Sequence, residues 1–422
     1  MEATRIRLAE GVHLTYLPAR KFKTSLLSAQ FVTPLRRETA GANALLAAVL
    51  RRGTVSCPDM GALSAKMDNL YDASIDYTVR KKGENQCVGF VASFIDDRYA
   101  PGGERLLEPA AALLGELVCD PVTYHGRFVP EYFESEKTNL LEAIRSLIND
   151  KRDWADSRLL RALCDGEAYA VPRLGDEETV DKLQALKVYT QYRDLISTAP
   201  LEIIYSGSAD LERVKQALAA AFATLPREEV RVISTAAPHV CRESVQHVED
   251  VLDVTQGKLG MGFSCGSDDM PALLMGNTLF GGSSNSKLFL NVREKLSLCY
   301  YASSLYHRQK GLITVSSGIE FQNYQRAYDE IMVQLEAVQK GELEDWELEG
   351  ARSTLLNSYA TVGDSQGKLE NFYLGQAATG QHETPADLAR AIQDMTAERI
   401  CRAMSTVKLD TVYFLKGKEA EA

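Results

Sequence analysis

The sequence predicts an α+β protein of two homologous halves, each an antiparallel sheet covered by helices on one face. Three observations predict this fold class. Strand-like segments precede long helical segments in the first half, the same order recurs in the second half, and short landmarks recur at matching positions. A chain of 422 residues is also too long for one compact core, which favours more than one domain.

In the first half, apolar and alternating residues at 25–35 predict a strand. The Ala/Leu-rich stretch 36–53 predicts a helix that starts near Thr39 as its cap and ends at Gly53. The segments that follow predict a short helix, two strands joined by a turn at 81–85, three helical stretches, and a closing strand and helix: 60–71, 74–80, 86–94, 103–119, 130–147, 157–164, 201–210 and 211–225.

The second half repeats this order, with a strand, helices, two strands and two long helices expected at 257–266, 270–282, 287–296, 300–306, 312–320, 324–341 and 342–359. Two landmarks also match: 70–74 leads to Lys82-Gly83, as 299–303 leads to Lys310-Gly311. The stretch 135–144 likewise parallels 350–359. We infer an internal duplication with its junction in 225–243, and hence domains at 1–230 and 231–422.

Composition excludes several functions. The formal charge of −11 and the shortness of the basic clusters, Arg51-Arg52 and Arg80-Lys81-Lys82, argue against nucleic-acid binding and favour solvated edges for both clusters. No apolar run has the length of a signal peptide or a membrane span, so we expect a soluble cytoplasmic protein without a membrane partner. The eight cysteines form no Cys-x-x-Cys pair, and no two of the six histidines have helical metal-site spacing.

Several stretches together resemble the pitrilysin or insulinase-type metallopeptidases, a family of inverted zincins that includes mitochondrial processing peptidase. They are NALLAAVLRRGT (43–54), FESEKTNLLEAI (133–144), GEAYAVPRLGDEETVDKL (166–183) and LFGGSSNSKLFLNVREKLSLCYYASS (279–304). FKTSLLSAQFVTPLRRET (22–39) and LINDKRDWADSRLL (147–160) are most similar to a bacterial non-catalytic branch, named for the aminopentanol modification of elongation factor P. The resemblance covers nearly the whole chain and implies a clamshell of two halves around a cavity.

Active members of this family carry H-x-x-E-H on the helix that corresponds to 36–53. Histidines four residues apart project from one helix face and both reach zinc, while the glutamate activates the metal-bound water. Alignment on Gly53-Thr54 places Ala44, Ala47 and Ala48 at the two histidines and the base. A methyl group can neither bind zinc nor take a proton, so the resemblance implies a helix that has lost its zinc site. The alternative is an Ala/Leu-rich buried helix without that history.

The family's third zinc ligand is a glutamate on a later helix, and Glu134 or Glu136 resembles it. One carboxylate cannot hold zinc where catalytic sites need three protein ligands, so both are vestigial candidates only and we expect no metal on this chain. The alternative for these glutamates is a solvated helix face.

The second half keeps an Arg and a Tyr that in active relatives hold the substrate near the scissile bond. They correspond to Arg293 and Tyr300, with Tyr301 as an alternative one residue along. A guanidinium and a phenol can both donate hydrogen bonds to a developing oxyanion. The alternatives are a surface ion pair of Arg293 with Glu294 and a core role for Tyr300.

A Gly/Ser-rich run at 280–287 lacks the pattern of a phosphate-binding loop. In the family, a similar turn lines the cavity, and Gly281 and Gly282 would allow a peptide backbone to approach closely. A plain turn between two helices explains the run equally well.

The resemblance implies a catalytically silent subunit. Paired with a zinc-bearing paralogue, it would bind and process a peptide or unfolded polypeptide, with zinc on the partner only. The alternative is a peptide-binding or scaffold subunit, a homodimer for example, without proteolysis. A third hypothesis, a metallopeptidase with an unusual metal set, conflicts with the missing ligands.

Overall fold

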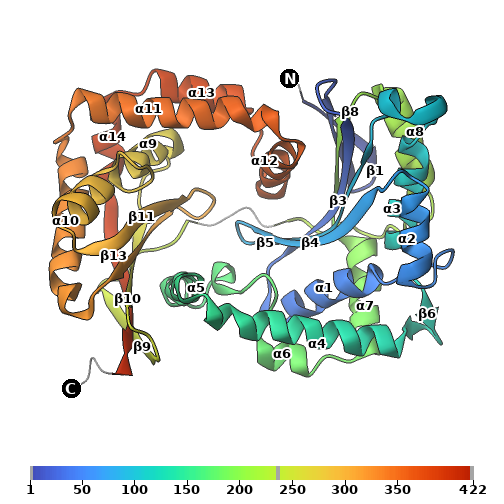
Figure 1. The fold of residues 1–422 in the computed structure, drawn as a ribbon, viewed down its shortest axis with the longest axis horizontal. Coiled ribbons are helices and arrows are strands. Elements are labelled where there is room, and N and C mark those ends of the chain that lie inside the picture. The colour runs from blue at the N-terminus through green and yellow to red at the C-terminus, as the bar shows by residue number, and fades with distance from the viewer. Residues whose placement is uncertain (1–2, 234–237, 419–422) are drawn as a thin grey trace. The chain divides into compact units, whose positions relative to one another are not determined.

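The computed structural model describes residues 3–233 and 238–418, which form two compact units (Figure 1). Unit 1 consists of residues 1–145, 171–235 and 363–382, and unit 2 of residues 146–170, 236–362 and 383–422. Each unit therefore contains a segment from the sequence half that supplies most of the other unit. Of the expected junction 225–243, residues 234–237 lie outside the described ranges.

A six-stranded sheet in the order β1-β2-β8-β3-β5-β4 forms the centre of unit 1. All neighbouring strands are antiparallel except β2 and β8, which are parallel. The strands are β1 Thr4–Ala9, β2 Val12–Pro18, β3 Thr24–Pro34, β4 Ser74–Lys82, β5 Asn85–Ile95 and β8 Leu201–Gly207, and a separate ribbon pairs β6 Thr123–Tyr124 with β7 Arg127–Phe128. Strand β4 lies at the edge of the larger sheet.

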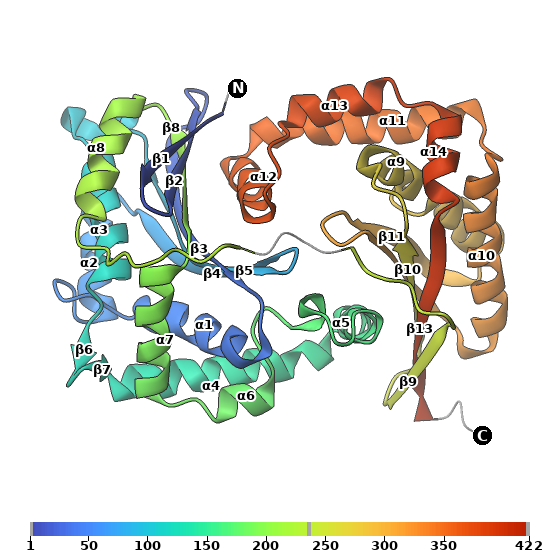
Figure 2. The ribbon, with the colours of Figure 1, turned by 180° about the vertical axis from the view of Figure 1, so that it is seen from behind.

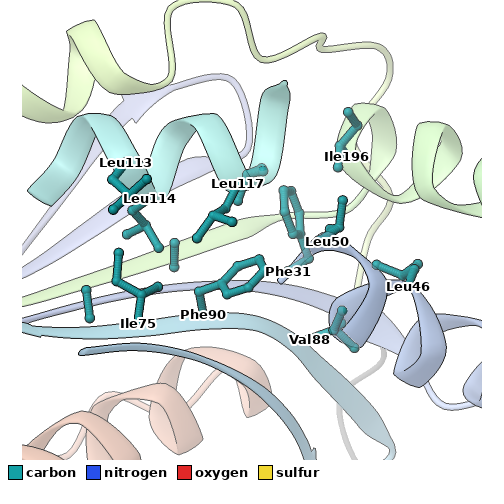
Figure 3. Packing of buried hydrophobic residues seen from close by; sticks show 14 of the residues in the cluster. Phe31, Leu46, Leu50, Ile75, Val88, Phe90, Leu113, Leu114, Leu117 and Ile196 are labelled. Carbon is teal, nitrogen blue, oxygen red and sulfur yellow. The ribbon is translucent and has the colours of Figure 1, made fainter. Parts of the chain in front are cut away.

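Helices cover the apolar face of this sheet and build the core of unit 1. Side chains alternate along a strand, so Leu27, Ala29 and Phe31 of β3 point to one face, where they pack among Leu50 and Leu114 in one buried cluster (Figure 3). The helices of unit 1 are α1 Arg37–Leu50, α2 Met60–Asp68, α3 Leu107–Cys119, α4 Pro130–Ser146, α6 Glu177–Asp181, α7 Ala185–Thr198, α8 Leu211–Ala221 and α12 Gln366–Thr379.

Helix α12 lies on the opposite face of the same sheet (Figure 1), where β3 presents polar residues. Gln366 donates hydrogen bonds to the main-chain oxygens of Thr24 (3.0 Å) and Ser206 (2.7 Å). Ser28 donates to Glu370 at 2.7 Å. Hydrogen bonds therefore help to hold α12 on this face, where the helix also buries the apolar side chains of Leu369 and Leu374.

Unit 2 is built around a five-stranded sheet in the order β11-β12-β10-β13-β9, in which only β13 and β9 are parallel. Its strands are β9 Gln246–Leu252, β10 Gly257–Cys265, β11 Cys299–His307, β12 Leu312–Ile319 and β13 Val407–Gly417. Its helices are α5 Lys151–Leu163, α9 Met270–Phe280, α10 Tyr324–Lys340, α11 Asp345–Ala360, α13 Pro385–Gln393, α14 Ala397–Met404 and a π-helix at Leu288–Lys295.

Helix α5 covers one face of this sheet, as both ribbon views show (Figures 1 and 2). It packs against β10 where that strand carries glycines. A Cβ atom at Gly260 would lie 3.1 Å from Leu159 Cδ2, and one at Gly262 would lie 2.7 Å from Leu163 Cδ2. The glycines thus let the helix approach the strand closely.

Helices α5 and α12 each belong to the unit that is built mainly from the other half of the sequence, and we call them the exchanged helices. They occupy equivalent places in the duplicated sequence. Helix α4, which contains 135–144, leads through a short 3-10 turn to α5, and α11, which contains the matching 350–359, leads through another to α12. Each exchanged helix begins at a capping side chain, Asp150 for α5 and Ser365 for α12. The structure therefore extends the repeat beyond the landmarks that the sequence showed.

The predicted α+β class is confirmed, with one parallel strand pair in each mainly antiparallel sheet. Some details differ from expectation. Helix α1 begins at Arg37 after the N-cap position Arg36, and Thr39 lies inside its first turn, so the predicted cap is wrong. The predicted helix at 287–296 is wound as a π-helix. Among the described residues, no helix is long and apolar enough to cross a membrane.

Candidate functional site

Unit 1 contains a cavity of about 980 Å³ at the position where the sequence suggested a lost zinc site. Its walls come from α1, β4, α4, α12 and the loop at 173–174, all of which belong to unit 1. Ala44 and Ala48, four residues apart on α1, both line it. Ala47 is not among the lining residues and is 1% exposed within the core.

Glu136 lines the same cavity, close to an arginine. Arg52 NH1 lies 2.9 Å from Glu136 Oε1, and Asn139 donates to Oε2 at 3.2 Å. The Arg52 guanidinium also lies 5.0 Å from the centre of the Tyr132 ring. A cation of the chain itself therefore balances this carboxylate.

The expectation of a solvated helix face fits one glutamate and not the other. Glu134 is exposed and does not line the cavity. Glu136 is only 9% exposed, so the solvated interpretation is wrong for it. The structure thus brings Ala44, Ala48 and Glu136 to one cavity and leaves Ala47 and Glu134 outside its lining.

The cluster Arg80-Lys81-Lys82 also lines the cavity, and its three partly exposed residues stand on the edge strand β4. Arg80 makes a two-point contact with Glu370 of α12, at 2.6 and 2.7 Å, and Glu370 is 3% exposed. Lys82 donates to Asn371 Oδ1 at 2.6 Å. Strand alternation places residues 78, 80 and 82 on one face, so the sequence alone indicates that these side chains lie together. Their partners on α12 are almost 300 residues away, where no local pattern indicates them.

A fourth cation, Arg173, lines the cavity beside the edge strand. Its NH1 donates to the main-chain oxygen of Val79 at 3.1 Å. Burial raises the pKa of nearby Tyr77, and the charge of Glu136 adds to that rise while Arg173 opposes it. The sequence singled out neither Arg173 nor Tyr77.

Arg293 and Tyr300 are neighbours in unit 2. Arg293 lies in the π-helix, and its Nε donates to the Tyr300 main-chain oxygen at 3.0 Å. Its guanidinium also contacts Glu294 at 3.2 Å. Tyr300 is 59% exposed, and its hydroxyl donates to Glu320, whose hydrogen bond and charge raise the pKa of Tyr300. Arg293 thus makes the surface ion pair that was one alternative, while Tyr300 is not a core residue.

The other predicted substrate-binding residues, Tyr301, Gly281 and Gly282, pack against other parts of the chain. Tyr301 lies under the Arg152 guanidinium, 4.4 Å from the centre of its ring. A Cβ atom at Gly281 would lie 2.7 Å from the main-chain nitrogen of Ser304, and one at Gly282 would lie 2.9 Å from Asn277 Nδ2. The close packing of this turn therefore accounts for both glycines.

One group of side chains in the described residues has donor atoms near enough for a metal: Cys164, Glu167 and His239 of unit 2, within 4.8 Å of one another. Glu167 and His239 already contact each other and further charged groups. Glu167 Oε1 lies 2.5 Å from His239 Nδ1, and its other oxygen pairs with the buried Lys310. His239 Nε2 faces Asp410 at 3.2 Å. An ammonium bound to the carboxylate explains the cluster as an internal ion network.

The native chain is expected to hold well under ~0.1 zinc per molecule after dialysis, because Ala44 and Ala48 supply no ligand and the carboxylate of Glu136 cannot hold zinc alone. Elemental analysis of the purified protein checks this. One tightly held zinc per chain would contradict it, and retention of that zinc in Cys164→Ser would then place the ion away from the Cys164 cluster.

Comparisons with known proteins bear on the family and the fold of the chain. The family model described as the peptidase M16 inactive domain matches residues 182–355. A Bacillus subtilis protein described as a probable inactive metalloprotease, YmfF, is 34% identical over 416 residues, 97% of this chain and 96% of its own. A second B. subtilis protein, the uncharacterized zinc protease YmxG, is 22% identical over 74% of this chain and 76% of its own. A conserved Enterococcus faecalis protein of known structure superposes with a TM-score of 0.89 at 26% identity, over 99% of both chains.

The fold and these matches define an inactive homologue of a metallopeptidase. The chain belongs to the M16 peptidase family, the inverted-zincin family that its sequence resembles.

Proposed function

We propose that this chain is the metal-free subunit of a two-chain peptidase. It pairs with a zinc-bearing paralogue of similar size, helps to hold a peptide or unfolded polypeptide, and contributes Arg293 and Tyr300 to the reaction. The observation that carries the proposal is the cavity of about 980 Å³ beside Ala44 and Ala48. It has the volume of a ligand site while its metal positions are methyl groups.

The chemistry of Arg293 and Tyr300 supports their role. A guanidinium can bind a carbonyl or oxyanion, and a phenol adds a second donor. The Arg293 side chain is 39% exposed and Tyr300 is 59% exposed, so both can reach a ligand. A cytoplasmic location is part of the proposal, and it is supported by the eight cysteines, none of which forms a disulfide in the described residues.

The test begins with the tagged chain isolated from its own cells. We expect a paralogue bearing H-x-x-E-H in stoichiometric amount, and peptide cleavage by the complex that a chelator abolishes. Arg293→Ala should lower kcat/KM by about 10²–10³-fold with assembly intact, because one oxyanion donor is lost. Arg326→Ala, at an exposed arginine of α10 in the same unit, is the matched control and should leave cleavage unchanged.

A non-proteolytic scaffold, for example a homodimer, is the second candidate. The contacts of Arg293 with Glu294 and of Tyr300 with Glu320 favour it, because a purely structural pair would make such contacts. Recovery of this chain alone would favour the scaffold. So would a complex whose cleavage is equal with Arg293→Ala and Arg326→Ala.

A further inference from the structure

The cavity of unit 1 is basic, although the chain as a whole is acidic. The formal net charge is −11. The cavity lining nevertheless contains four cationic side chains, Arg80, Lys81, Lys82 and Arg173, against the carboxylates of Glu136 and Glu370. Each of these carboxylates is already bonded to a guanidinium, Glu136 to Arg52 and Glu370 to Arg80. The lining thus favours an anionic occupant.

The shape of the site favours an extended occupant. Residues 77–82 of β4 line the cavity, and β4 is the edge strand of the sheet. An edge strand presents main-chain groups that can pair with an added strand. The lining also includes the small or apolar side chains of Ala44, Ala48 and Leu140. These side chains leave room for an occupant and carry no charge.

Arg173 links the charge to the edge strand. Its NH1 donates to the Val79 main-chain oxygen at 3.1 Å, which covers an acceptor that an added strand would use. A carboxylate on the occupant can accept hydrogen bonds from two guanidinium nitrogens at once, a two-point contact that is stronger than the single bond to a carbonyl. Such a contact would draw Arg173 from Val79 and free that oxygen for main-chain pairing.

We infer that the cavity selects extended peptides with acidic side chains, and that Arg173 is the main partner of the acidic group. This inference rests on the proposed peptide-holding function and adds the class of peptide. Arg173 then has two alternative partners. Without an acidic peptide it donates to the Val79 main-chain oxygen, and with one it binds the carboxylate of the peptide.

The test uses blocked, fluorescent peptides about 12 residues long, a length that spans the edge strand, with Glu, Gln or Lys at the same alternate positions. Anisotropy is measured on the full chain. The Glu peptide should bind at least ~10-fold more tightly than the Gln peptide, with the Lys peptide weakest. The advantage of Glu should shrink between about 0.05 and 0.5 M salt, since screening weakens exposed charge pairs.

Arg173→Gln should weaken binding of the Glu peptide by about tenfold, because the carboxylate loses its guanidinium partner. Binding of the Gln peptide should be unchanged or slightly tighter, because Arg173 no longer covers the Val79 main-chain oxygen. Lys187→Gln makes the same charge change at an exposed residue of α7 outside the cavity lining. It should change neither affinity, and circular dichroism confirms that both variants are folded.

Equal binding of the Glu and Gln peptides to the native chain overturns the acidic preference and leaves peptide holding intact. Equal effects of Arg173→Gln and Lys187→Gln overturn the role of Arg173. If none of the peptides binds, the peptide-holding function fails and the inference fails with it.

Discussion

Ala44→His combined with Ala48→His is expected to produce a chain that binds about one zinc ion, with a Kd on the order of micromolar or tighter. Histidines at this spacing project from one helix face. Ala44, Ala48 and Glu136 line the same cavity, so two imidazoles and a carboxylate can converge there. The cavity of about 980 Å³ has room for both rings. Elemental analysis and titration with a zinc-sensitive dye measure the gain.

Two controls isolate the cause of that gain. Ala44→His alone should bind zinc at least ~10-fold more weakly, because it lacks a second imidazole. The double variant with Glu136→Gln should also lose affinity, since the third ligand is gone. Equal zinc content in the single and double variants would contradict the proposed alignment of α1 with Glu136. No peptidase activity is expected from the double variant alone, because Ala47 still provides no general base.

Glu370→Ala is expected to destabilise unit 1 by about 3–5 kcal/mol, because it leaves the partly buried Arg80 without its carboxylate. Glu370 is 3% exposed and also accepts a hydrogen bond from Ser28 at 2.7 Å. Both tryptophans, Trp154 and Trp346, belong to unit 2, so their fluorescence would miss the change. Urea unfolding followed by circular dichroism, with hydrogen exchange of α12, measures it.

The control for this prediction lies at the start of the same exchanged segment. Asp364 pairs with Lys21 at 2.7 Å, with both side chains largely exposed, so Asp364→Ala should leave the urea midpoint unchanged. Arg80→Met combined with Glu370→Leu should recover part of the lost stability, since it removes both charges together. A midpoint for Glu370→Ala equal to that of Asp364→Ala would show that the ion pair does not hold α12 in place.

Local patterns predicted much of the fold. Strands β3, β4, β5, β10 and β12 carry the alternation or apolar runs that define strands, and they form near the predicted positions. No helix or strand is predicted beyond residue 359, although β13 lies between β10 and β9 in the second sheet and α12 covers the first. The place of these elements depends on partners far away in the sequence.

For the site, the loss of metal donors could be inferred because it concerns three positions on one helix. The arginine partners of Glu136 and Glu370 could not be predicted. Arg52 and Glu136 are 84 residues apart, and Arg80 and Glu370 are 290 apart. Such ion pairs leave no periodic trace in a single sequence. Arg173 is equally hidden, because it acts on the main chain of β4 and so requires no particular side chain as its partner.

The exchange of α5 and α12 constrains the order in which the protein can be made. Domains usually fold as units, the N-terminal one first, while the ribosome is still translating. Here unit 1 requires residues up to 382, so its sheet stays uncovered on one face until about nine-tenths of the 422 residues have been synthesised. Unit 2 in turn waits for β13 near the C-terminus while α5 is made early. A gene cut between the two halves would therefore yield fragments that each carry the helix the other needs.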